Sequence, residues 1–141
     1  MTKRDAGSVS VEIAVLAPAF LLLVVLAAVA GRTAIAQNAV DLAAHEAART
    51  ASLARTAATA EVQGEAAANA TLAEQGLDCG NSLVVEVNTS GFAADLGEPA
   101  TVTATVTCDV SLADLAMPGV PGSKTVQATY VSPLDRYRSR G

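Results

Sequence analysis

The sequence predicts an α+β protein in which a long N-terminal helix is followed by a small antiparallel sheet. Three observations support this class. An uncharged apolar run covers residues 13–30, an alanine-rich stretch without glycine or proline covers residues 32–62, and segments of alternating apolar and polar residues come after it. The 141 residues leave room for one small domain beside the apolar run.

The apolar run is long enough to cross a bilayer, because 18 helical residues extend about 27 Å and the hydrocarbon layer is roughly 30 Å thick. No charge stands between Glu12 and Arg32. Pro18 is tolerated in membrane helices, where neighbouring groups satisfy the carbonyl that it leaves free. Lys3 and Arg4 favour a cytoplasmic N-terminus. We therefore expect a single-pass membrane protein with its C-terminal part outside the cytoplasm.

The same run allows two other interpretations. In a cleaved secretory signal, the A-x-A cleavage pattern would be "AVA" before Gly31 or "AIA" before Gln37, although the run exceeds the usual length of about 7–15 residues. An uncleaved anchor fits the length and the orientation, but it gives no reason for the acid beside the run, Glu12. The position of that acid favours a third interpretation.

This third interpretation starts from the stretch "GSVSVE", Gly7 to Glu12, which is directly followed by "IAVLAPAFLLLVV". The combination resembles the processing site of type IV pilin-like proteins. In that family a short basic leader ends in glycine, a prepilin peptidase cuts after it, and the fifth residue of the mature chain is glutamate. The resemblance implies cleavage between Gly7 and Ser8, which makes Glu12 the fifth residue.

The resemblance also implies a role for Glu12. A carboxylate near the hydrocarbon is costly unless it finds a partner, and the new α-amine of Ser8, in the same or a neighbouring subunit, is such a partner. In the family this pairing registers subunits as they leave the bilayer for a filament. Glu12 is thus the expected subunit-registration acid.

The helix is expected to continue beyond the membrane from Arg32 to about Val62, since Ala, Leu, Gln and Arg favour helix. Apolar and small residues at spacings of three, four and seven predict one continuous apolar surface along this helix: Ile35, Ala39, Val40, Leu42, Ala43, Ala47, Ala51 and Ala54. We expect Gly64 to break or bend this helix, and a further short helix to stop at Gly76.

The rest of the chain alternates with a period of two. In "TVTATVTCDV", residues 101–110, the valines, alanine and cysteine face one way and the threonines the other. "SLVVEVN" and "KTVQATYV" repeat the pattern, with Leu83, Val85, Val87 and Val126, Ala128, Tyr130 as inward faces. "NTSG", "LGEP" and "MPGVPGSK" are typical of turns. Three strands with one polar face predict a sheet laid against the outer half of the long helix.

The two cysteines, Cys79 and Cys108, both follow the apolar run. Outside the cytoplasm such a pair indicates a disulfide; two unpaired thiols are the alternative. The bond would close a loop of about 30 residues and stabilise the fold by about 3–4 kcal/mol on the chain-entropy model. It would hold the end of the helical region against the middle strand.

No group of residues indicates an enzyme. His45 is the only histidine, and "HEAAR" has Arg49 where the zinc motif H-E-x-x-H requires a second histidine. The cysteines are too few for a structural zinc site. Nine acids and no Lys or Arg occupy residues 61–114, which argues against nucleic-acid binding. We expect no catalytic residue, metal, cofactor, nucleic acid or small-molecule substrate.

The layout as a whole resembles the TadE/TadF group, the minor pseudopilins of the tight-adherence (Flp) pilus system. These proteins share the G-x-x-x-x-E start, a spanning helix, an alanine-rich helix with an "EAAR"-like stretch (here Glu46 to Arg49) and a short β-rich C-terminal part. In Flp pilins a tyrosine often follows the glutamate, whereas Ile13 stands here.

The resemblance implies a pilin-like fold and a non-enzymatic pseudopilin. Its partners would be a prepilin peptidase, other pilins or pseudopilins, the pilus assembly machinery and membrane lipid. The expected division is residues 1–7 as leader, 8–31 as transmembrane helix, 32–76 as helical region outside the cytoplasm and 77–141 as disulfide-stapled β-rich domain. The alternative is an exported or anchored envelope binding module, which the processing site would distinguish.

Overall fold

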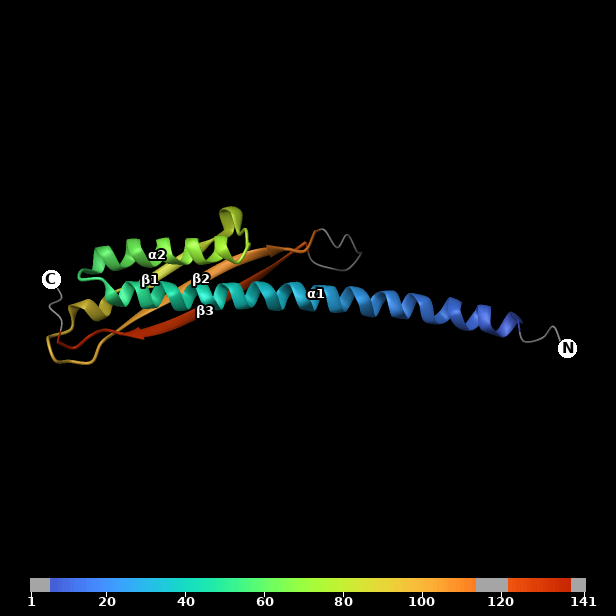
Figure 1. The fold of residues 1–141 in the computed structure, drawn as a ribbon, viewed down its shortest axis with the longest axis horizontal. Helices are drawn as coiled ribbons and strands as arrows, with labels where there is room; N and C mark the ends of the chain where they lie inside the picture. Colours follow the sequence, from blue (N-terminus) through green and yellow to red (C-terminus); the bar gives the residue numbers. More distant parts are fainter. Residues whose placement is uncertain (1–5, 114–121, 138–141) are drawn as a thin grey trace.

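The structure is a computed structural model that describes residues 6–113 and 122–137 (Figure 1). Its elements are α1 Ala6–Leu53, α2 Ala57–Glu74, the 3₁₀ helix η1 Gly80–Ser82, β1 Val84–Asn88, the 3₁₀ helix η2 Ser90–Ala93, β2 Thr101–Ser111 and β3 Ser123–Pro133. The expected α+β class is confirmed: a long apolar N-terminal helix is followed by a small antiparallel sheet.

α1 is one continuous helix of 48 residues, about 72 Å long. It passes through Pro18, which has no N–H to donate to the carbonyl of Ala14. The apolar run and the first part of the alanine-rich stretch therefore form a single rod, as predicted.

The prediction that the helix continues to about Val62 and breaks at Gly64 is wrong. α1 ends at Leu53, and Thr56 takes an extended backbone (φ −128°, ψ 154°) and caps α2 by accepting a hydrogen bond from the Thr59 N–H at 3.2 Å. Gly64 lies inside α2 and is buried. The chain turns at a threonine cap, which satisfies free N–H groups, rather than at the glycine.

Gly64 serves packing. A Cβ at this position would stand 3.0 Å from Val87 Cγ2 and 3.3 Å from both the Ala47 carbonyl oxygen and Ala51 Cβ. The lack of a side chain thus lets α2 approach α1 and β1 closely. The predicted stop at Gly76 is confirmed, since α2 ends at Glu74 and Gly76 has a positive φ of 67°.

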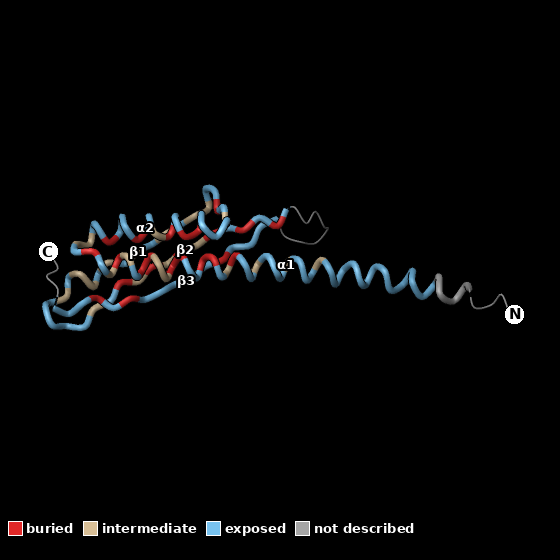
Figure 2. Tube along the Cα trace, in the orientation of Figure 1, coloured by how far each residue is buried: buried red, intermediate tan, exposed pale blue. Residues whose placement is uncertain are grey.

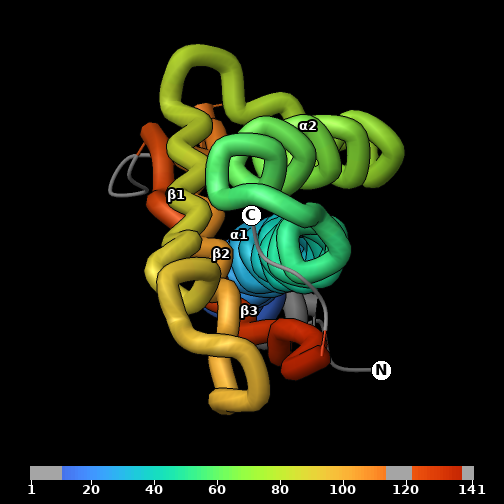
Figure 3. The backbone as a smooth tube through the Cα atoms, turned by 90° about the vertical axis from the view of Figure 1, so that its left-hand side faces the viewer, coloured from blue at the N-terminus to red at the C-terminus, as the bar shows by residue number. Residues whose placement is uncertain are grey.

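The sheet has the order β1-β2-β3, with both pairs antiparallel. Val106 of β2 lies opposite Val85 of β1 and Ala128 of β3, so the inward faces of the three strands coincide. Figure 3 shows both helices on one side of the sheet, with α2 beside β1 and α1 running toward β3. The result is two layers, helices on sheet, and no described helix covers the opposite face of the sheet.

The core lies between these layers and is built mainly from small side chains. The buried residues of α1 and its end are Ala36, Ala39, Val40, Ala43, Ala44, Ala47, Ala48, Ala51 and Ala54, and those of β2 are Val102, Ala104, Val106, Cys108 and Val110. The predicted inward face of β2 is confirmed. On β3 the prediction holds for Val126, which is buried, whereas Tyr130 lies at the rim and is 41% exposed.

Candidate membrane and assembly helix

The N-terminal half of α1 projects beyond the two-layer domain with its apolar side chains exposed (Figure 2). Its exposed large apolar residues are Val11, Ile13, Val15, Leu16, Phe20, Leu21, Leu22, Leu23, Val24 and Leu26. The most apolar 18-residue stretch of α1 has a mean hydropathy of 2.9, and none of it is buried. In the described part of the chain, α1 is the one helix long and apolar enough to cross a membrane.

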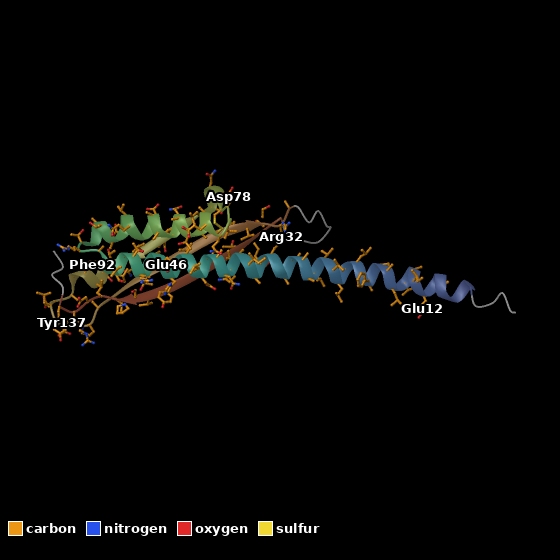
Figure 4. All side chains as sticks on the ribbon, in the orientation of Figure 1. Glu12, Arg32, Glu46, Asp78, Phe92 and Tyr137 are labelled. Carbon is orange, nitrogen blue, oxygen red and sulfur yellow. A yellow bond between two sulfur atoms is a disulfide. The ribbon has the colours of Figure 1, made fainter. Side chains whose placement is uncertain are left out.

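The expected processing residues stand at the far end of this rod. Gly7 and Ser8 belong to the first turns of α1, which begins at Ala6, and Glu12 follows one turn after Ser8. Figure 4 shows Glu12 remote from every strand. Within the described residues, the exposed Glu12 carboxylate has no ion-pair or hydrogen-bond partner. The Glu12 side chain thus stands apart from the folded domain.

The exposed half ends where the domain begins. Arg32 is the first charged residue after the apolar run, and the first buried residue beyond it is Ala36. Between them the Thr33 hydroxyl donates to the Val29 carbonyl at 2.9 Å, so this polar side chain is satisfied within the helix. Gln37 bonds to the sheet, its Nε2 donating to the Gln127 carbonyl at 2.9 Å.

Two further contacts hold β3 along α1. The His45 and Tyr130 rings meet edge to face, with their centroids 4.3 Å apart and the planes at 82°. Farther along, the Ser132 and Ser52 hydroxyls lie 3.0 Å apart. Sequence reasoning found none of these polar and aromatic contacts, because each joins residues 80 to 90 positions apart and leaves no local pattern.

His45 thus has a structural contact. Its Nδ1 lies 3.5 Å from Glu46 Oε1, and both side chains are only partly exposed, at 38% and 36%. Among the described residues, no group of three His, Cys, Asp or Glu side chains is placed to hold a metal ion. Within the "HEAAR" stretch the two alanines are buried in the core, and His45 and Glu46 lie partly exposed beside it.

The predicted bond between Cys79 and Cys108 is present, with the two Cα atoms 5.4 Å apart. Cys108 is fully buried in β2 and Cys79 is 9% exposed. Beside the bond, the Ser82 hydroxyl donates to the Cys79 carbonyl at 2.6 Å and accepts from the Asp109 N–H at 3.0 Å. The covalent bond and this serine together join the end of the helical region to the middle strand.

The hollows on the surface of the domain include two that described residues line. One, of about 410 Å³, follows the end of α2 beside the disulfide and is lined by Asn69, Leu72, Ala73, Gly76, Leu77, Asp78, Cys79, Gly80 and Leu83. The other, of about 310 Å³, is lined by Glu61 and Glu65 of α2 and by Val85, Glu86 and Val87 of β1. Neither lining contains a histidine, serine, threonine or lysine.

Residues 7–49 match the family model described as TadE-like protein. The match begins at Gly7, includes Glu12 and the apolar run, and ends at Arg49, so it covers most of α1. The predicted resemblance to TadE-like proteins is confirmed over these residues. No curated protein and no solved structure matches the chain.

Proposed function

We propose that the protein, whose residues 7–49 are TadE-like, is a non-enzymatic minor pseudopilin. It assembles into, or helps to assemble, a Flp/Tad-type pilus or a related secretion filament. The family match by itself suggests association with the Tad pilus. The finer role is supported by the shape and surface of α1.

The exposed apolar half of α1 is the observation that carries the proposal. A patch of exposed apolar side chains larger than a few hundred Å² is rare on a soluble monomer and marks contact with lipid or protein. Here every residue from 11 to 24 is exposed. Lipid covers this surface before assembly, and the equivalent helices of neighbouring subunits cover it in a filament.

The position of Glu12 fits the same role. Cleavage between Gly7 and Ser8 creates an α-amine one helical turn from the carboxylate in the same chain, and an equivalent amine on every neighbour. A carboxylate at the edge of the hydrocarbon is stabilised by such a cation. The pairing then sets the axial position of one α1 against the next.

The proposed division of the chain gives each part a task. Residues 1–7 are the leader, 8–31 the spanning helix, 32–76 the helical region and 77–141 the β-rich domain. Because α1 passes through the boundary at residue 31 without a break, axial movement of the spanning helix moves the domain with it. The disulfide keeps that domain folded outside the cytoplasm.

The first test is the N-terminus of the protein purified from its native membranes, measured by intact mass and by the terminal peptide. The proposal expects a start at Ser8. A start at Gly31 or Gln37 would mean that the apolar run is discarded, and would favour an exported binding module. An intact Met1 would favour a plain anchor and leave Glu12 without a role.

The second test is Glu12→Ala, with Glu65→Ala on the exposed side of α2 as the matched control. Membrane insertion should persist, because the apolar run is intact. Loss of a charge-assisted contact of about 1.5–3 kcal/mol should lower pilus numbers about tenfold or more. Pili are counted by electron microscopy. Normal numbers in the Glu12→Ala strain would remove the role proposed for the acid.

A further inference from the structure

The position of β3 along α1 is set by contacts at both ends of their packed region. Gln37 bonds to the Gln127 carbonyl, and Ser52 bonds to Ser132. Residue numbers rise in the same direction along both elements. The beginning of β3 therefore lies toward the exposed apolar half of α1, as Figure 1 shows.

Lys124 lies at the level where the apolar run ends. It precedes Gln127 by three residues, which is about 10 Å along a strand. The same distance along α1 covers six to seven residues, counted back from Gln37. Lys124 is thus within about one turn of Arg32 along the axis, and Figure 4 shows Arg32 at the level of this end of the sheet.

This end of the sheet carries a basic residue of β3, Lys124. Lys124 is the only basic residue between Arg55 and Arg136. It is exposed, and it shares with Val126 the sheet face that α1 covers, since alternate residues of a strand point to the same side. The nearby Asp109 belongs to the opposite face, where it accepts a hydrogen bond from the Thr125 hydroxyl. Lys124 and Arg32 are therefore two cations at the same height along α1, on the side of the sheet that carries the helices.

We infer that this end of the sheet, Lys124 together with Arg32, is a membrane contact that binds the phosphate groups of phospholipid headgroups. The inference depends on the proposed function, since it requires residues 8–31 to span the bilayer. Because α1 is unbroken, placing Glu12 and Arg32 at the two hydrocarbon edges brings Lys124 to the headgroup layer without any rearrangement. The contact sets the depth of the domain, and it must be released when the subunit leaves the membrane.

The test uses the absence of tryptophan from the chain. Full-length Ser123→Trp carries one reporter beside Lys124. Leu96→Trp places the reporter in the loop before β2, at the opposite end of the sheet, where Leu96 is 67% exposed. Leu22→Trp places it in the apolar run. Each variant is reconstituted in vesicles of phosphatidylcholine with phosphatidylglycerol that carry nitroxide quenchers, either at the headgroup or deep in the acyl chains.

Headgroup quenchers should quench the Ser123→Trp variant several-fold more than the Leu96→Trp variant, while deep quenchers act on the Leu22→Trp variant. Equal, weak quenching of the Ser123→Trp and Leu96→Trp variants, with the Leu22→Trp variant still quenched from the deep position, overturns the membrane contact and leaves the spanning helix intact. A Leu22→Trp variant that the deep quenchers do not reach overturns the spanning helix and the inference together.

The charge is tested separately by adding Lys124→Glu to the Ser123→Trp protein, with Arg136→Glu as the matched control at the opposite end. Each basic group near an anionic surface should change the ratio of domains in contact with the membrane to domains out of contact about fivefold. The quenching should fall with Lys124→Glu, more steeply in phosphatidylglycerol than in phosphatidylcholine, and stay unchanged with Arg136→Glu. Unchanged quenching in the Lys124→Glu protein overturns the phosphate contact.

Discussion

The two halves of α1 have the same backbone and opposite surfaces (Figure 2). From residue 11 to 35 most side chains are exposed, and valine, leucine, isoleucine and phenylalanine dominate the apolar run. From residue 36 onward a stripe of alanines is buried against α2 and the sheet. Large apolar side chains serve the half that the chain leaves uncovered, and small ones serve the half that it covers itself.

The difference follows from how close the partner comes. Alanine lets a second backbone approach, and Gly64 of α2 comes so near that an added Cβ would stand 3.3 Å from Ala51 Cβ. Close approach multiplies weak dispersion contacts, which individually contribute only about 0.1–0.2 kcal/mol. Among the described residues the exposed half has no such partner, and its large side chains are suited to lipid or to other subunits.

The largest predicted effect is loss of the bond between Cys79 and Cys108. Replacing both with alanine should lower the free energy of unfolding of the domain by about 3–4 kcal/mol, since the bond closes a loop with a sequence separation of 29. Hydrogen exchange of the β2 amides in detergent-solubilised protein measures this change. Reduction of the wild-type protein should reproduce it. Unchanged β2 exchange would show that the covered half needs no covalent support.

The comparison of the two halves is tested most directly by one substitution made in each. Ala47→Leu places a large side chain in the fully buried stripe and should destabilise the domain by about 1–3 kcal/mol through overpacking. Ala27→Leu makes the same change on the exposed half and should leave β2 exchange unaltered. Equal effects at the two positions would contradict the division of α1 into a covered and an uncovered half.

The smallest effect concerns the turn that ends the covered half. Thr56→Ala removes the oxygen that accepts from the Thr59 N–H and should cost about 1 kcal/mol. Thr56→Ser keeps a capping hydroxyl and serves as the control. Exchange of the α2 amides should quicken in the alanine variant and stay near wild type in the serine variant. Equal exchange in both variants would mean that packing alone positions α2.

Much of the architecture was predictable because it depends on local pattern. The span from residue 13 to 30 follows from length and hydropathy, and the face of β2 from strict alternation. The disulfide followed from the number and placement of the cysteines. Glu12 could be singled out because an acid beside an apolar run needs an explanation, and the family match covers that position.

The predictions failed where the local sequence did not decide between two structures, such as a longer helix and a helix that ends. Helix-forming residues continue past Leu53, so propensity did not locate the end of α1, which the structure places three residues before the Thr56 cap. Gly64 was interpreted as a breaker because glycine is costly in a helix, but its missing side chain is offset by close packing. Tyr130 lies on the face that packs on α1, as alternation predicts, but it stands at the edge of the sheet against His45 and stays 41% exposed.

The sequence by itself determined which segments are apolar, which alternate and where the chemistry-bearing residues stand, because these are properties of neighbouring residues. Tertiary structure decided where α1 ends, why Gly64 is small, and that Lys124 reaches the level of Arg32. The physical reason is that each of these depends on the distance between elements far apart in the chain. That distance is set by packing and by long-range hydrogen bonds, which no local pattern records.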